Sequence, residues 1–188
     1  MFGDHGKLYV PAELVEIYRN DVIPLANVVT PNQFEAEQLT GISIQSLEDA
    51  KRAIDALHDL GPELVVMTSF VLKGQDDKMY ILASQRDKKG DNEKETEGKL
   101  WCVESPVLPG TYTGTGDLTA ALFLAWTAKD PNNLGKILER VVSTMYTVIK
   151  TTQEESDGTV AGKELQLIRS KEVIETPPEL FKATQLLK

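Results

Sequence analysis

The stretch Leu64-Val65-Val66-Met67-Thr68 decides the fold class of this chain. It is continuous and apolar, and it follows the breakers Gly61-Pro62, so it predicts a strand that is buried on both faces. A helix is predicted before it, because Ser46-Leu47-Glu48-Asp49 resembles a capping box and apolar residues then recur at helical spacing. A buried strand that follows an amphipathic helix is typical of an α/β fold.

The rest of the chain repeats this alternation of short apolar segments and helical patterns. Extended segments are expected at 8–10, 27–30, 79–84, 99–104 and 165–168, and helices at 12–18, 33–39, 115–128 and 134–152. The segment 27–30 is interpreted as a buried strand. An α/β sheet with helical crossovers follows from this order.

The remaining segments are polar. The charged stretch 85–98 is expected to be a surface loop, because the strands on either side can pair across it. Residues 154–162 are expected to form a flexible connection, and 175–188 a tail along the surface. With 188 residues, the chain 1–188 is long enough for one core, so a single domain is expected.

Composition narrows the classes of partner and location. The net charge of -9 and the pI near 4.8 argue against nucleic acid or an anionic membrane as a partner. Cys102 is the only cysteine and cannot form an internal disulfide, and the start of the chain does not have the pattern of a signal peptide. We therefore expect a protein of the cytosol.

The turn Gly114-Thr115-Gly116-Asp117 leads directly into an apolar helical run. Such a turn exposes backbone N–H groups at the positive end of a helix, where they can hold a phosphate. The N–H groups of Gly114, Thr115 and Gly116 can then neutralise a transferred phosphoryl group, while Asp117 accepts a proton from the attacking hydroxyl. The alternative is an ordinary glycine turn with an acidic residue in the first turn of a helix.

A second candidate lies at Asn32 and Glu35, which share a face on the first turn of a helix. An amide and a carboxylate at this spacing can hold a hydrated Mg²⁺. The same pattern also describes a helix cap, and spacing alone favours the cap.

Two hydroxyls, Thr68 and Ser69, end the clearest strand, where ligands of open α/β sheets collect. Ordinary turn chemistry explains them equally well, and Asp4 in the opening turn is similarly ambiguous. His5 and His58 are not at metal-ligand spacing, so no zinc site is indicated. Cys102 is interpreted as a small core residue.

Taken in order, six segments closely resemble the pyridoxal kinases of the ribokinase-like superfamily. They are Gly3-Asp4, Leu8-Tyr9-Val10-Pro11, Thr30-Pro31-Asn32-Gln33-Phe34-Glu35-Ala36-Glu37-Gln38-Leu39-Thr40-Gly41, Val66-Met67-Thr68-Ser69, Gly114-Thr115-Gly116-Asp117 and Ala125-Trp126-Thr127. The resemblance implies a three-layer α/β/α fold. It also implies ATP-dependent phosphorylation of the 5′-hydroxyl of pyridoxal, pyridoxine or pyridoxamine.

The resemblance further implies roles for individual residues. Asp117 is similar to the catalytic base, and Gly114, Thr115 and Gly116 are similar to the anion hole. The residues similar to those that bind ATP are Asn32, Glu35, Thr68, Ser69, Tyr9, Leu108, Pro109, Gly110, Tyr112 and Ile149. A divalent cation, Mg or Zn, is implied near Asn32 and Glu35, largely through water. A monovalent cation, K or Na, is implied near Asp4, Thr30 and Thr68. The family's kinases are typically homodimers.

The similarity runs from about Phe2 to Ile168 and corresponds to the C-terminal half of these kinases. We therefore expect the N-terminal strands and the lid hairpin to be missing, and the isolated chain to have much reduced or no kinase activity. Two other hypotheses stay open. One is a non-catalytic product of an alternative start or an incomplete gene model, acting as a nucleotide-binding or dimerisation module. The other is a related kinase for a hydroxymethylpyrimidine.

Overall fold

The computed structural model describes residues 2–4, 6–86, 98–156, 159 and 161–186. Their main sheet has five strands in the order β3 (Val28–Val29), β4 (Leu64–Phe70), β5 (Lys78–Gln85), β6 (Lys99–Pro106) and β7 (Thr184–Leu186). β3 and β4 are parallel, and the other neighbours are antiparallel. β5 and β6 pair along their full lengths, as the sequence predicts for the strands that flank the charged stretch; residues 87–97 of that stretch lie outside the described residues.

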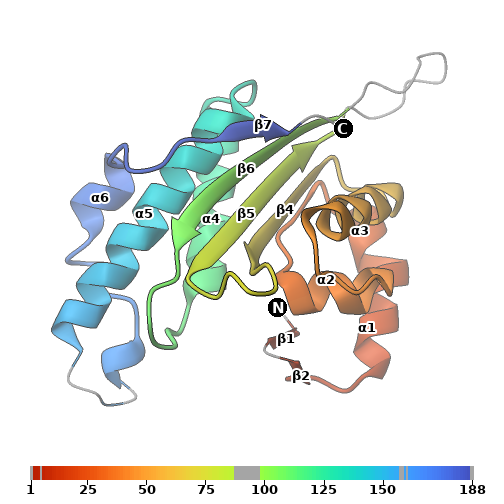
Figure 1. Ribbon diagram of the computed structural model, residues 1–188, viewed down its shortest axis with the longest axis horizontal. Coiled ribbons are helices and arrows are strands. Elements are labelled where there is room, and N and C mark those ends of the chain that lie inside the picture. The colour runs from red at the N-terminus through yellow and green to blue at the C-terminus, as the bar shows by residue number, and fades with distance from the viewer. Residues whose placement is uncertain (1, 5, 87–97, 157–158, 160, 187–188) are drawn as a thin grey trace.

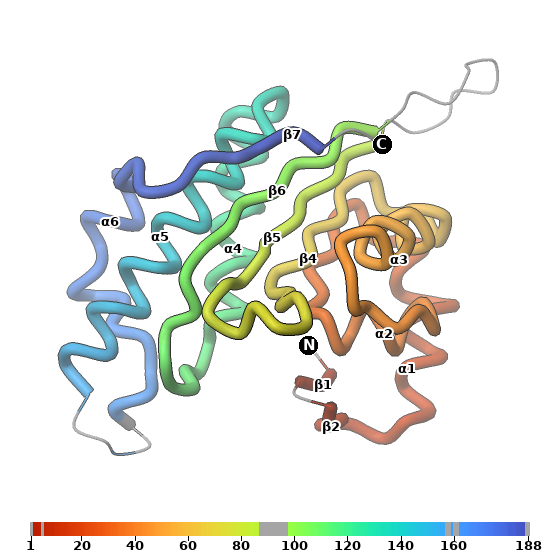
Figure 2. Tube along the Cα trace, in the orientation of Figure 1, coloured from red at the N-terminus to blue at the C-terminus, as the bar shows by residue number. Residues whose placement is uncertain are grey.

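Helices cover both faces of the sheet (Figure 1). One face carries α1 (Glu13–Ile17), which continues as a π-helical turn (Tyr18–Val22) and a 3-10 turn (Ile23–Leu25), α2 (Gln33–Thr40) and α3 (Leu47–Asp59). The other carries α4 (Thr115–Lys129), α5 (Leu134–Glu155), the 3-10 turn Ala161–Lys163 and α6 (Lys171–Glu175). The two groups lie on opposite sides of the strands in Figure 2, which confirms the predicted three-layer α/β/α fold.

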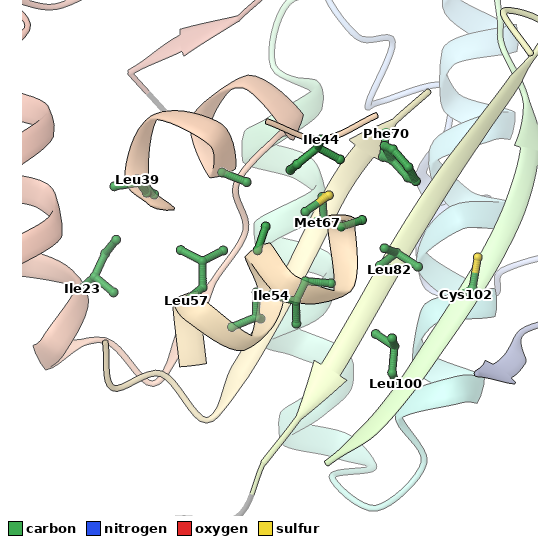
Figure 3. Close-up of a cluster of buried hydrophobic side chains, with 14 of the residues drawn as sticks. Ile23, Leu39, Ile44, Ile54, Leu57, Met67, Phe70, Leu82, Leu100 and Cys102 are labelled. Atoms are coloured by element: carbon green, nitrogen blue, oxygen red, sulfur yellow. The ribbon is translucent and has the colours of Figure 1, made fainter. Parts of the chain in front are cut away.

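The alternation of side chains along β4 separates two cores. Val65 and Met67 belong to the core beneath α3, where Figure 3 shows Met67 with Ile54 and Leu57. The intervening Val66 packs toward α4 and α5. Successive residues of a strand point to opposite faces, so a strand between two helical layers must be apolar at every position. This is why the clearest apolar run in the sequence forms an inner strand.

β3 differs from its prediction. Val28 is 36% exposed, because β3 pairs only with β4 and forms the edge of the sheet that the described residues build. The expected buried strand is therefore an edge strand. Its register with β4 places Val28 opposite Leu64, on the face toward α4 and α5.

The C-terminal region also differs from its prediction. Residues 165–168 form no strand; only Glu164 makes an isolated bridge, to Thr113. Glu154 and Glu155 belong to α5 and not to a flexible connection. The final strand is β7, within the segment expected to be a surface tail, and Phe181 before it packs edge-on against Tyr146 of α5, with ring centroids 5.3 Å apart.

A separate hairpin, β1 (Gly3–Asp4) and β2 (Lys7–Leu8), precedes α1 and does not join the main sheet. It lies at the end of the sheet where β4 stops and α4 begins, the lower end in Figure 1. Among the residues that the structure describes, no helix is long and apolar enough to cross a membrane.

Candidate active site

A cavity of about 380 Å³ opens where the end of β4, the segment after β6, the start of α4 and one face of α5 meet. Most of the residues selected from the sequence line it, although they come from five separate parts of the chain. They are Asp4, Tyr9, Asn32, Thr68, Ser69, Leu108, Gly110, Tyr112, Thr115, Gly116 and Ile149. Five of the selected residues do not line it: Thr30, Glu35, Pro109, Gly114 and Asp117.

The start of α4 is built from backbone alone. Gly114 is the N-cap, with a left-handed φ of 89°, and it provides no side-chain cap. The first helical bond runs from the Leu118 N–H to the Gly114 carbonyl at 3.0 Å. The N–H groups of Thr115, Gly116 and Asp117 therefore have no acceptor within the helix. They provide the positive end of a 15-residue helix at the edge of the cavity.

Asp117 sits in this first turn and is exposed, but it is not among the residues that line the cavity. Thr115 and Gly116, the two residues before it, line the cavity instead.

The segment after β6 is held by its own contacts. The Tyr112 hydroxyl donates to the Pro109 carbonyl at 2.7 Å, and the ring folds over Gly110. Gly110 has a φ of 111°, and a Cβ there would lie 2.9 Å from the Tyr112 hydroxyl oxygen. Only glycine fits this turn without strain. The Thr113 N–H donates to the Lys163 carbonyl at 3.0 Å, which fixes the approach to Gly114.

A β-bulge places the two hydroxyls. β4 continues to Phe70 and does not end at Thr68, but Thr68 and Ser69 together lie opposite one residue of β5, because Met67 pairs with Leu82 and Phe70 with Tyr80. The Thr68 N–H donates to the Pro31 carbonyl at 3.0 Å. This bond holds Thr68 beside the start of α2, and both Thr68 and Ser69 line the cavity together with Asn32.

Asn32 and Glu35 form a complete capping box at the start of α2. The Asn32 Oδ1 accepts from the Glu35 N–H at 2.8 Å, and the Glu35 Oε2 accepts from the Asn32 N–H at 3.2 Å. Glu35 Oε1 also accepts from the N–H groups of Phe2 at 2.6 Å and Gly3 at 3.3 Å, and Asn32 Nδ2 donates to the Gly3 carbonyl at 2.9 Å. The interpretation as a helix cap is confirmed.

These contacts limit how the pair could meet a metal ion. Glu35 is only 3% exposed, and its two oxygens already accept three backbone N–H groups. Direct ligation of Mg²⁺, which needs near-octahedral geometry at about 2.0–2.1 Å, does not fit this donor set, whereas a contact through water does. Within the described part of the chain, no three residues among His, Cys, Asp and Glu gather as a metal site.

Residues that the sequence did not single out build the apolar wall. They lie on β5, after β6 and along one face of α5: Met79, Ile81, Val107, Val141, Val142 and Met145. On α5, Val141, Val142 and Met145 recur at helical spacing, which predicts that they share the inward face of the helix. Spacing does not distinguish a face packed on the core from one that contacts a ligand, so the signal could not identify them as site residues.

His58 and Cys102 lie elsewhere, in the core. The His58 ring nitrogens contact the Pro62 carbonyl and the Ser84 hydroxyl, both at 2.9 Å. Burial raises the pKa of the Cys102 thiol to about 11. Both residues are structural, and the prediction of a small core residue at Cys102 is confirmed.

Comparison with known proteins gives consistent results. The family described as phosphomethylpyrimidine kinase matches residues 1–137. A pyridoxal kinase of Arabidopsis thaliana is 41% identical over 188 residues, which cover 97% of this chain and 58% of that protein. The solved pyridoxal kinase of Leishmania donovani in complex with ADP is 30% identical, with a TM-score of 0.87 over 100% of this chain and 61% of that one. The same kinase with ADP and pyridoxamine has a TM-score of 0.86 over 99% of this chain and 60% of that one.

The chain thus spans about three fifths of the length of the relatives that it matches. The family match covers nearly three quarters of the chain and includes α2, the strands β4 to β6 and the start of α4. The chain therefore belongs to the phosphomethylpyrimidine kinase family, and its fold is that of the ribokinase-like superfamily.

Proposed function

We propose that the cavity binds the phosphates of Mg-ATP and that the γ-phosphoryl group is transferred to the 5′-hydroxyl of a B6 vitamer, with the much reduced turnover expected of a chain that spans about three fifths of the length of its relatives. The observation that carries this proposal is the convergence of an uncapped helix N-terminus with Asn32, Thr68 and Ser69 around one cavity. The N–H groups of Thr115 and Gly116 and the dipole of α4 favour an anion there. The Leishmania donovani kinase, which has the same fold, binds ADP.

The apolar part of the cavity suits the adenine ring. Leu108, Tyr112 and Ile149 line it together with the apolar face of α5, and Tyr9 lies on the same boundary. A flat aromatic base gains from burial against such a wall. Gly110 and Pro109 act by shaping the segment that presents Tyr112.

The reaction proposed is an in-line transfer. Asp117 removes the proton of the acceptor hydroxyl, its oxygen bonds to the γ-phosphorus, and ADP leaves with the electrons of the broken P–O bond. Asp117 is exposed in the first turn of α4, beside the amides proposed to hold the phosphates, so an acceptor can reach its carboxylate. The amides of Gly114, Thr115 and Gly116 would stabilise charge that develops on the transferred group.

The cations belong to the same proposal. Mg²⁺, or Zn²⁺, enters with the nucleotide, and Asn32 and Glu35 would meet it only through water. A monovalent cation, K⁺ or Na⁺, is proposed beside Asp4 and Thr68, which share the cavity. Thr30 does not line the cavity, so a role for it would require a contact outside the lining.

A homodimer is also proposed. This proposal rests on the resemblance to kinases that are typically homodimers, because single exposed leucines such as Leu25 (85%) and Leu124 (68%) do not identify an interface. Light scattering across a range of protein concentrations measures this property.

The acceptor is proposed as pyridoxal, pyridoxine or pyridoxamine, because the Leishmania donovani kinase binds pyridoxamine together with ADP. The second candidate acceptor is a hydroxymethylpyrimidine, which the description of the matching family favours. Phosphorylation of each acceptor by the purified chain, made in a host without its own pyridoxal kinase, separates the two. Faster transfer to the pyrimidine would reject the B6 assignment.

The nucleotide part has its own test, because it needs no acceptor. Calorimetry should detect binding of Mg-ATP to the chain in the absence of any vitamer. Binding without phosphorylation of either acceptor would instead agree with a nucleotide-binding module.

A further inference from the structure

We propose that Glu35 is a positioning residue, whose carboxylate holds the β1–β2 hairpin in place and so sets one wall of the cavity. This inference rests on the proposed nucleotide site, but its structural part can be tested without any nucleotide. This structural role of Glu35 is separate from any contact with a metal ion.

The first step is the set of hydrogen bonds. Glu35 Oε1 accepts from the N–H groups of Phe2 and Gly3, at 2.6 and 3.3 Å, although the hairpin lies more than 30 residues away in sequence. Asn32 completes the attachment by donating to the Gly3 carbonyl at 2.9 Å. One side chain and its capping partner thus bind both the N–H and the C=O of Gly3.

The second step is electrostatic. A carboxylate at 3% exposure needs compensation for its lost hydration. Three backbone N–H groups and the positive end of α2 provide it. Hydrogen bonds to an ionised acceptor are stronger than neutral ones, so the charge contributes directly to holding the hairpin.

The third step is steric. Gly3 lies so close to α2 that a Cβ would stand 2.5 Å from Phe34 Cε1 and 2.8 Å from the Lys7 carbonyl. Phe2 is buried against Tyr18, with ring centroids 5.4 Å apart. The hydrogen bonds to the carboxylate therefore lie within a closely packed contact between the hairpin and the helices, and not in a loose surface contact.

The final step links this contact to the cavity. Asp4 follows Gly3 directly, and Tyr9 donates its N–H to the Phe2 carbonyl at 2.9 Å. Both Asp4 and Tyr9 line the cavity, whereas Glu35 does not. Loosening Glu35 should therefore move two residues of the ligand wall without removing any of them.

Glu35→Gln tests the proposal, since it preserves shape but removes the charge and turns one acceptor into a donor. Glu37→Gln is the matched control: Glu37 lies on the same helix and accepts the Ile44 N–H at 2.7 Å, away from the hairpin. We expect hydrogen exchange at the amides of Gly3 and Tyr9 to accelerate about 10-fold or more in Glu35→Gln and to stay unchanged in Glu37→Gln. Unchanged exchange in Glu35→Gln would overturn the proposal.

The second readout is ATP affinity, measured by calorimetry with Mg²⁺ and with the metal chelated. A positioning residue should weaken ATP binding by the same factor, about 10-fold, in both conditions. A loss seen only with Mg²⁺ would overturn the proposal in favour of a metal contact. If the parent chain binds no ATP, the proposed function fails, while the exchange measurement still decides the role of Glu35.

Gly3→Ala is a second variant that does not alter the carboxylate. Its Cβ would clash with Phe34 of α2 and with the Lys7 carbonyl within the hairpin, so it should displace the hairpin and reproduce the faster exchange at Tyr9 and the weaker ATP binding. If Glu35→Gln does not fold, Gly3→Ala still tests whether displacing the hairpin weakens ATP binding. Unchanged exchange at Tyr9 and unchanged ATP affinity in that variant would contradict the link between hairpin and cavity.

Discussion

Two helices begin at the same cavity, and their first turns are built in opposite ways. The start of α2 is closed: Asn32 and Glu35 cap it, and their polar atoms bind the backbone of the same chain. The start of α4 is open: Gly114 provides no side-chain cap, and the amides that follow have no acceptor within the helix. Both turns carry the positive end of a helix, but only the start of α4 has no side-chain cap.

The difference shows that the residues at the start of a helix decide whether its first N–H groups are satisfied within the protein or left available. A helix start that is filled by its own side chains stabilises the fold and holds the neighbouring hairpin. A helix start made of glycine and threonine leaves its N–H groups available for an anion. In our proposal, the closed turn fixes one wall of the cavity and the open turn provides the groups that bind the phosphates.

The largest effect is expected at the open turn. Asp117→Asn should lower the phosphorylation of pyridoxal about 100- to 10,000-fold, because a base within hydrogen-bond reach is lost, while ATP affinity stays within about twofold of the parent chain. Radiolabelled ATP makes even slow turnover measurable. Asp21→Asn, an exposed aspartate on the turn after α1, is the control and should leave turnover unchanged.

Equal turnover in Asp117→Asn and the parent chain would remove the base from the account. A parent chain with no turnover would reject kinase activity of the chain itself and leave the binding function to be tested alone.

Gly114→Ala should have the next largest effect. A Cβ at a φ of 89° costs about 1–2 kcal/mol, and the strain should shift the amides of Thr115 and Gly116, so that ATP binds about 10-fold more weakly. Gly41→Ala has a similar φ of 72° at the end of α2 and open space around it. It should lose similar stability in urea unfolding but keep full ATP affinity. Equal losses of affinity in both variants would break the comparison.

Asn32→Ala should show the structural character of the closed turn. Loss of an N-cap costs about 0.5–2 kcal/mol, and the bond to the Gly3 carbonyl adds to this. Ser46→Ala removes the equivalent cap of α3, far from the cavity. In chemical unfolding, the free energy of unfolding of Asn32→Ala should be equal to or lower than that of Ser46→Ala. Only Asn32→Ala should bind ATP more weakly than the parent chain. Normal ATP affinity in Asn32→Ala would separate the cap from the site.

The smallest effect concerns the sheet between the two helices. Burial raises the pKa of Cys102 from 9.0 to about 11, so the folded state holds a proton that the unfolded chain loses first. The contribution of the protonated thiol to the free energy of unfolding should therefore be fully present below pH 9 and be lost as the pH rises toward 11. In unfolding experiments at a series of pH values, Cys102→Ala should lose less stability between pH 9 and 11 than the parent chain.

The buried Cys102 thiol also serves as a control for the site variants. Rapid thiol labelling of a site variant at neutral pH would indicate that its sheet, and not only its site, has loosened.

The inner strands and the long helices could be predicted because local pattern determines them. The run 64–68 is apolar at every position, and Asn32, Ser46 and Gly41 mark helix ends by side-chain or backbone chemistry. Thr184–Leu186 could not be predicted, since a three-residue edge strand depends on its partner β6 and on the anchoring of Phe181 against Tyr146.

The site divides in the same way. Residues with distinctive chemistry, such as Thr68, Ser69 and Gly116, could be selected from the sequence, and the structure brings them to one cavity. The bulge at Thr68 and Ser69 was not predictable, because it arises from pairing with β5. The bonds from Glu35 to Phe2 and Gly3 were equally hidden, since they join segments that are distant in sequence.

The central claim is that the open turn of α4 receives the phosphates of a nucleotide. Calorimetric titration of the chain with Mg-ATP and, in parallel, with adenosine tests it most directly, because the two ligands share the base and differ in the phosphates. The account predicts that Mg-ATP binds at least about 10-fold more tightly than adenosine and that Gly114→Ala removes most of this difference. Equal affinity for the two ligands, or a difference that survives in Gly114→Ala, would contradict it.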